Sequence, residues 1–196
     1  MQEGENKTTR INLMQTSMTL GTYLGIYVIV LYAVFALSLK FSALSILSLP
    51  LMIGVPFVAY FLQKRFRDRN SPEVFPFPVS WMIAILMFLF STILSCMVAY
   101  LYLRFIDHGQ IVAGMKNMMD AFTMSASQTT AGMTDPAQIE AFNTQMETIG
   151  KYVNWMCGLP ASGLTKILVQ ASLTWGNILS LIIGIITTKR IKFKQQ

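Results

Sequence analysis

The sequence predicts an all-α integral membrane protein with four transmembrane helices and an extracytoplasmic two-helix hairpin between spans three and four. Three observations predict this fold. Apolar residues make up 54% of the chain and charged residues only 12%, whereas soluble domains carry roughly 25% charged residues. The apolar residues fall into long runs without any charge, and a long polar segment, residues 104–160, separates the last two runs.

The uncharged runs cover residues 11–39, 41–63, 79–103 and 167–188. About 20 apolar residues cross a hydrocarbon core of roughly 30 Å, so the first two runs, divided by Lys40 alone, fit two helices better than one helix and an interfacial segment. We place the spans near 20–39, 43–62, 79–103 and 167–188. The first run is longer than a signal-peptide core and no cleavage pattern follows it, so we expect it to remain as a span.

The distribution of basic residues predicts the orientation. Dense clusters occur at 64–69 and 189–194, and basic residues close to span ends mark the cytoplasmic side. We therefore expect a cytoplasmic tail at 1–19, spans one to three within 20–103 with a basic cytoplasmic loop at 64–78, an extracytoplasmic hairpin at 104–162, span four at 163–188 and a basic cytoplasmic tail at 189–196. The net charge of +6 is thus assigned to orientation on the lipid bilayer and not to nucleic-acid binding.

Small residues recur every four positions in three spans, which places them on one helix face. Such residues let neighbouring helices approach closely and predict a compact bundle. Pro50 and Pro56 in span two predict a kink, because each proline removes a backbone hydrogen bond. The small residues are Gly21 and Gly25; Ser91, Ser95 and Ala99; and Ser172, Gly176, Ser180 and Gly184.

Span four also carries a polar face, at spacings of 4, 4 and 3 residues: Lys166, Gln170, Thr174 and Asn177. Hydrocarbon cannot satisfy these groups, so we expect them to turn inward or toward a water-filled cavity. Interhelical hydrogen bonding is the favoured interpretation, and a solute path is the alternative. No ionisable residue lies in the middle of a span, which argues against an ion-coupled transporter.

The polar segment contains two amphipathic patterns joined by small polar residues at 125–134. In the second pattern Asp135 is suited to cap the helix and Pro136 to begin it. An apolar stripe with a spacing of 3 and 4 residues follows, and it must be covered by the other helix, the bundle mouth, the membrane surface or a partner. We favour a hairpin that caps the bundle. The stripe consists of Ile139, Phe142, Met146, Ile149, Val153 and Met156.

Candidate catalytic groups are sparse, and we expect no enzyme and no cofactor. Asp107 and His108 form an acid–base pair without a nucleophile or metal partner, so an interfacial cap is favoured. Ser162 and Lys166 match no dyad spacing. Cys96 and Cys157 have no metal-ligand spacing around them, and we expect both to be free.

The chain resembles a family of small four-span inner-membrane proteins of unknown function, common in Bacteroidetes-type bacteria. The features that carry the resemblance are the Gly-x-Tyr-Leu-Gly opening at 21–25, the FPVS entry to span three at 77–80, the Y-x-x-x-R-F-I-D segment at 100–107, DPAQIEAF at 135–142 and SLIIGIITTKR at 180–190. In that family the Phe-Ile-Asp is often followed by proline, whereas His108 follows here. The resemblance implies a bacterial inner membrane location and no particular activity.

The favoured function is therefore a structural or partner-binding membrane bundle with an external helical cap. Its partner would be another membrane or periplasmic protein or a second copy of the chain. The alternative is a small transporter or solute-binding bundle that uses the polar face of span four beneath the kinked second span.

Overall fold

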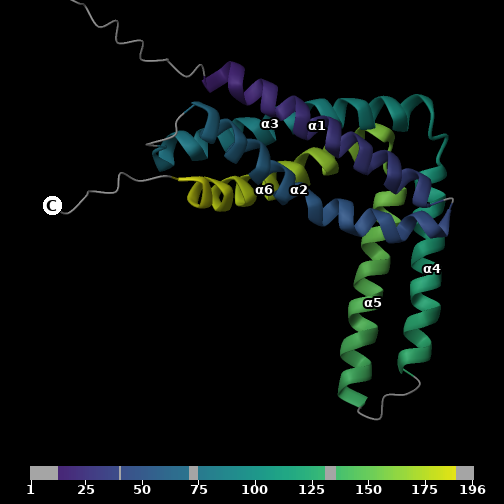
Figure 1. Ribbon diagram of the computed structural model, residues 1–196. Helices are drawn as coiled ribbons and strands as arrows, with labels where there is room; N and C mark the ends of the chain where they lie inside the picture. The colour runs from purple at the N-terminus through teal and green to yellow at the C-terminus, as the bar shows by residue number, and fades with distance from the viewer. Residues whose placement is uncertain (1–12, 40, 71–74, 131–135, 189–196) are drawn as a thin grey trace, which may run out of the picture.

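The computed structural model describes residues 13–39, 41–70, 75–130 and 136–188. Four of its helices lie side by side as a bundle, and two project from one end of that bundle (Figure 1). The predicted all-helical fold with four membrane-length helices is confirmed, and two further helices lie between the third and the fourth of them. The helices are α1 (Leu13–Ser38), α2 (Ser42–Asn70), α3 (Phe77–Phe105), α4 (Gln110–Thr130), α5 (Pro136–Cys157) and α6 (Ala161–Thr187).

The bundle consists of α1, α2, α3 and α6, and each is long and apolar enough to cross a membrane. Their outward faces carry large apolar side chains, such as Ile46, which is 77% exposed, and Phe61, which is 63% exposed. Water would disfavour such a surface, whereas lipid chains cover it without cost. The chain is therefore a multi-pass membrane protein, as its composition predicted.

Several helix boundaries differ from the sequence-based prediction. The second helix continues to Asn70, so the whole basic cluster at 64–69, which was expected in a loop, is helical. Lysine and arginine are good helix formers, and arginine near a helix C-terminus interacts favourably with the helix dipole. Arg67 from this end donates to the Thr187 carbonyl at 3.1 Å and pairs with Asp68 at 2.7 Å, which fixes the end of α2 beside the end of α6.

The polar linker is also shorter than expected, because α4 continues to Thr130. The remainder of that linker and the predicted cap Asp135 lie outside the described residues. The same holds for the tail at 189–196 and for the first twelve residues, while α1 is already helical at Leu13.

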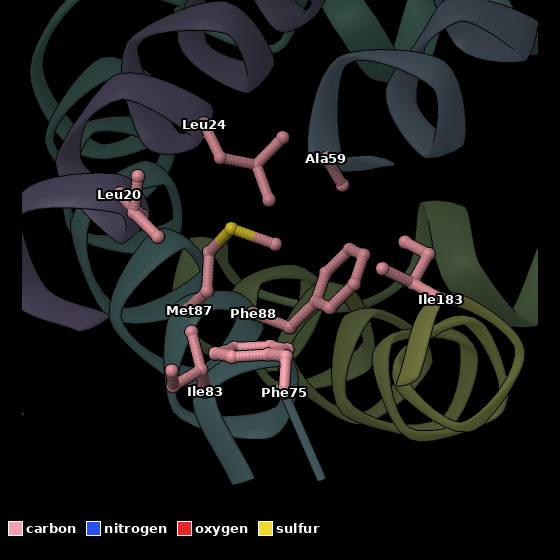
Figure 2. Close-up of a cluster of buried hydrophobic side chains, with 8 residues drawn as sticks. All are labelled: Leu20, Leu24, Ala59, Phe75, Ile83, Met87, Phe88 and Ile183. Atoms are coloured by element: carbon pink, nitrogen blue, oxygen red, sulfur yellow. The ribbon is translucent and has the colours of Figure 1, made fainter. Parts of the chain in front are cut away.

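The apolar core lies where the four spans meet, and α3 is the most enclosed of them. Figure 2 shows the core side chains pointing toward one another from α1, α2, α3 and α6, together with Phe75, which precedes α3. Because lipid chains are as apolar as these side chains, the core stabilises the bundle through close packing and not through removal of the side chains from water. The core members are Leu20, Leu24, Ala59, Phe75, Ile83, Met87, Phe88 and Ile183.

Small residues bring the other helices close to α3, as the four-residue repeats predicted. A β-carbon added at Gly21 would lie 2.6 Å from the Phe90 β-carbon and 2.8 Å from the Met87 carbonyl oxygen. On the other side of α3, one added at Gly176 would lie 3.1 Å from the Phe88 β-carbon. The bundle packing therefore depends on the absence of side chains at these contacts.

The two prolines of α2 lie inside a continuous helix. Between them, the Tyr27 hydroxyl of α1 donates to the Leu51 carbonyl at 2.8 Å. Gly54 faces the same hydroxyl, and a side chain there would collide with it. This bond ties the proline-containing part of α2 to α1.

Candidate functional site

The two helices that leave the bundle, α4 and α5, form a projecting arm. They run side by side (Figure 1) and contact each other. The Met119 methyl group lies 3.7 Å from the position of a β-carbon added at Gly150, and the Cys157 thiol donates to the Val112 carbonyl at 3.8 Å. The arm is thus held together by contacts between α4 and α5.

The arm does not cap the bundle, contrary to the favoured expectation. It meets the bundle at its root, where Gly114 of α4 packs against Leu39 after α1 and leaves no room for a side chain. A crevice of about 240 Å³ at this root is lined by the ends of α1 and α3 and the first turns of α4. Beyond the root, α4 and α5 extend sideways, away from the four spans (Figure 1).

The turn between α3 and α4 sets this direction. His108 and Gly109 both have positive φ angles, 45° and 84°, a region that glycine adopts freely and few other residues do. The Asp107 carboxylate, only 3% exposed, accepts from the Gly109 amide at 3.1 Å and the Ile111 amide at 2.9 Å. Asp107 therefore caps α4, while His108 is exposed and stands in the bend.

The apolar stripe of α5 is only partly covered by α4. Five of its residues are half-buried and Ile149 is 43% exposed. Among the described side chains of both arm helices, Gly114 at the root is the only fully buried residue. The half-buried members of the stripe are Ile139, Phe142, Met146, Val153 and Met156.

Several exposed apolar side chains of the arm share one side, whereas Met124 and Trp155, which are 70% and 58% exposed, lie on the other side. At 100° per residue, Met118 and Phe122 lie about a quarter turn from the side of α4 that touches α5, and Ile149 lies about a quarter turn from the side of α5 that touches α4. Because the two helices are antiparallel, these quarter turns bring the side chains of both helices to the same side of the arm. We call Met118, Phe122, Ile149 and the adjacent Tyr152 the apolar face of the arm; these four are 43–64% exposed.

The opposite side of the arm carries its charged residues beside the exposed Met124 and Trp155, and it includes an ion pair between Lys151 and Glu147 at 2.7 Å, one helical turn apart. The hydrogen bond from Lys151, followed by its positive charge, lowers the pKa of the Glu147 carboxyl. Both side chains are well exposed, so the pair contributes little to stability. The charged residues of this side are Lys116, Asp120, Glu140, Glu147 and Lys151.

The polar face of the fourth span does not turn inward, contrary to expectation. Lys166, Gln170, Thr174 and Asn177 are all exposed along α6. The face of α6 that packs on α3 carries Gly176, Ser180 and Gly184 instead. A helix presents only one face to a given neighbour, and the smaller residues permit the closer approach.

One buried polar cluster was not anticipated from the sequence. At the end of the bundle opposite the arm, the Gln63 amide donates to the Ser80 carbonyl at 2.7 Å and to its hydroxyl at 2.8 Å. The Ser80 hydroxyl in turn contacts the Thr187 hydroxyl and the Gly184 carbonyl. All three side chains are fully buried, so α2, α3 and α6 are joined by polar contacts. The sequence feature that could have indicated this cluster is Gln63, a polar residue at the end of the uncharged run 41–63.

The remaining candidate groups are not brought together. Ser162 and Lys166 are exposed near the start of α6. Cys96 is buried in α3 and Cys157 half-buried at the end of α5, and both are free. Within the described ranges, no cluster of three metal-ligating side chains occurs. The geometry thus gathers polar groups for structure and leaves two surfaces uncovered, the apolar face of the arm and the polar face of α6.

Comparison with known families agrees with this architecture. A family model described as "Protein of unknown function (DUF4199)" matches residues 19–189. The chain belongs to this family. The match covers the four spans and the arm together, so the arm is part of the DUF4199 region and not an addition to it. No curated protein and no solved structure matches the chain.

Proposed function

We propose that this DUF4199 protein is a non-enzymatic membrane protein that binds a protein partner through the apolar face of its arm. The observation that carries the proposal is the combination of a sideways arm with exposed apolar side chains on one side. Such a face is unfavourable in water and is stabilised when another apolar surface packs against it.

A protein is the better cover than a lipid surface. Helices that lie on anionic membranes are usually rich in lysine and arginine, whereas residues 110–157 contain two basic and four acidic residues. The apolar face also contains methionine, whose flexible side chain adapts to the shape of a partner. The second candidate, a solute-binding bundle, gains no support, because the polar residues of α6 face away from the other three spans.

We place both ends of the chain in the cytoplasm of a bacterial inner membrane and the arm outside. The support is the position of Arg67 beside Thr187 at the end of the bundle opposite the arm, together with the excess of basic residues there. A reporter fused after Gln196 should read cytoplasmic, and one inserted near Thr130 should read external. The reverse pattern would overturn this orientation.

Site-specific photo-crosslinking in living cells tests the partner. A photoreactive residue at Ile149 or Phe122 should give one protein adduct of defined mass, whereas the same residue at Glu147, on the polar side of α5, should not. Phe122→Glu should remove the Ile149 adduct without lowering the amount of protein in the membrane. Adducts to lipid alone, or equal adducts from both sides, would refute protein binding by this face.

A further inference from the structure

The polar face of α6 is an uncovered feature of the membrane-spanning part of the chain. Gln170, Thr174 and Asn177 are exposed, while the buried face of α6 lies against α3. At 1.5 Å per residue, Gln170 lies about 14 Å from the first residue of α6 and Asn177 about 15 Å from the last. Both amides therefore lie deep in a hydrocarbon core of roughly 30 Å.

The chain itself does not satisfy these amides. Within the described residues, the side chains of Gln170 and Asn177 take part in no hydrogen bond, and the Thr174 hydroxyl bonds only to the Gln170 carbonyl of its own helix at 2.9 Å. Lipid chains offer no donor or acceptor, and an unsatisfied polar group in hydrocarbon is costly. A groove of about 370 Å³ beside this face, between α3 and α6, has an almost wholly apolar lining and cannot satisfy them either.

We infer that this polar face of α6 is an interface between two copies of the chain. Two copies inserted in the same direction are related by a twofold axis along the membrane normal, so their α6 helices run parallel. Each residue on the face then meets the same residue of the partner copy at the same depth. A side-chain amide carries both a donor and an acceptor, so glutamine pairs with glutamine and asparagine with asparagine.

The spacing along α6 suits such a pair. Gln170 and Asn177 are seven residues apart and Thr174 lies between them, which matches the repeat of left-handed helix pairs. Leu181, four residues after Asn177 and 46% exposed, continues the face with an apolar contact.

Lys166 is the only member of the face that repels its own copy. It lies about 8 Å from the start of α6, where a lysine side chain extends to the headgroup level and keeps its charge in water. The two lysines are then separated and hydrated, while the amides one turn and more below them stay in contact.

Symmetric cysteine crosslinking of the full chain in native membranes tests the interface. In a background with Cys96→Ala and Cys157→Ala, Thr174→Cys and Asn177→Cys should each form a disulfide dimer upon oxidation. Trp175→Cys and Ile182→Cys, which are 65% and 45% exposed and lie more than a quarter turn from the middle of the polar face, serve as controls. Equal crosslinking of the controls, no dimer from the polar face, or adducts to another protein only would each overturn the proposal.

Dissociation in lipid vesicles gives an independent measure. Gln170→Leu and Asn177→Leu preserve helix and volume but remove the amide, and each should weaken the dimer between about threefold and about twentyfold, the range of measured interhelical hydrogen bonds. Ile182→Leu, on another side of α6, should leave the dimer unchanged. An unchanged dimer in the Gln170→Leu, Asn177→Leu double variant would refute the role of the amides even if the variant folds normally.

Discussion

The amide nitrogen of Gln63 donates to both the carbonyl and the hydroxyl oxygen of Ser80, at 2.7 and 2.8 Å. The two residues come from the end of α2 and the start of α3, and the Ser80 hydroxyl also reaches the Gly184 carbonyl of α6 at 3.1 Å. In a bundle whose outer surface is apolar, this contact holds three helices in one register.

Ser80→Ala should therefore loosen the end of the bundle opposite the arm. It removes the hydroxyl from three contacts and leaves the buried Gln63 amide with one acceptor. Interhelical hydrogen bonds in membranes contribute about 0.6 kcal/mol on average and at most about 1.7 kcal/mol, so we expect a loss of about 1 kcal/mol or slightly more. Unfolding of the purified protein in detergent, by heat or by denaturing detergent, measures it.

Thr22→Ala is the matched control for Ser80→Ala. Thr22 is exposed on α1, and its hydroxyl donates only to the Met18 carbonyl of the same helix at 2.8 Å. Its removal should change the unfolding free energy by no more than a few tenths of a kcal/mol, as for other surface substitutions. If the two variants were equally stable, the hydrogen bonds of Ser80 would not stabilise the contact between α2, α3 and α6.

The parts of the fold that local sequence determines were predicted correctly. Uncharged runs long enough to span a membrane gave four spans, and the 3 and 4 spacing from Ile139 to Met156 gave α5. The direction of the arm was not predictable in this way. It depends on the backbone of His108 and Gly109, and nothing in the neighbouring residues distinguishes a turn that folds α4 over the bundle from one that sends it sideways.

The exposed position of the polar face of α6 could not be predicted for a related reason. Span four carries small residues on one face and polar residues on the next, and both kinds are typical of helix contacts. Only the three-dimensional packing decides between them. Gly176 and Gly184 fit against α3, with added β-carbons 3.1 Å from Phe88 and Trp81 atoms, and this leaves Gln170 and Asn177 outside.

Gly21→Ala should destabilise the bundle strongly. The new methyl group would overlap the Phe90 β-carbon and the Met87 carbonyl oxygen, at 2.6 and 2.8 Å, and neither atom can move without shifting α3. Overpacking of this kind costs about 1–3 kcal/mol. The decrease should be visible in the thermal unfolding of the purified protein and in the yield of folded protein.

Gly150→Ala in α5 is the matched comparison for Gly21→Ala. A methyl group there meets only the Met119 methyl group, at 3.7 Å, which is an ordinary contact. Alanine is favoured over glycine in a helix by up to about 1 kcal/mol, so this variant should be as stable as the parent or slightly more so. A loss at Gly150 as large as at Gly21 would show that close packing on α3 is not the cause.

Glu147 should titrate at a lower pH than an isolated glutamate, because Lys151 lowers its pKa. A carboxyl whose folded pKa is depressed contributes stability above its unfolded pKa and loses it as the pH falls through the folded pKa. Carboxyl NMR of the protein in micelles should show the Glu147 midpoint rise in Lys151→Met. Because the pair is fully exposed, the melting temperature should hardly respond, and an unchanged midpoint would mean that the ion pair does not form in solution.

Asp107→Ala should release the start of α4 from its cap. The substitution removes the acceptor for the Gly109 and Ile111 amides, and loss of a helix N-cap costs about 0.5–2 kcal/mol. Hydrogen exchange of these two amides should accelerate, while exchange in α3 remains slow.

Two control variants should keep the amides protected. Asp107→Asn should keep most of the protection, because its amide oxygen still accepts a hydrogen bond. His108→Gly should keep it fully, because glycine adopts the positive φ of 45° without strain. If His108→Gly instead abolished the cellular function and Asp107→Asn did the same with the cap intact, this pair would have a chemical role beyond the turn.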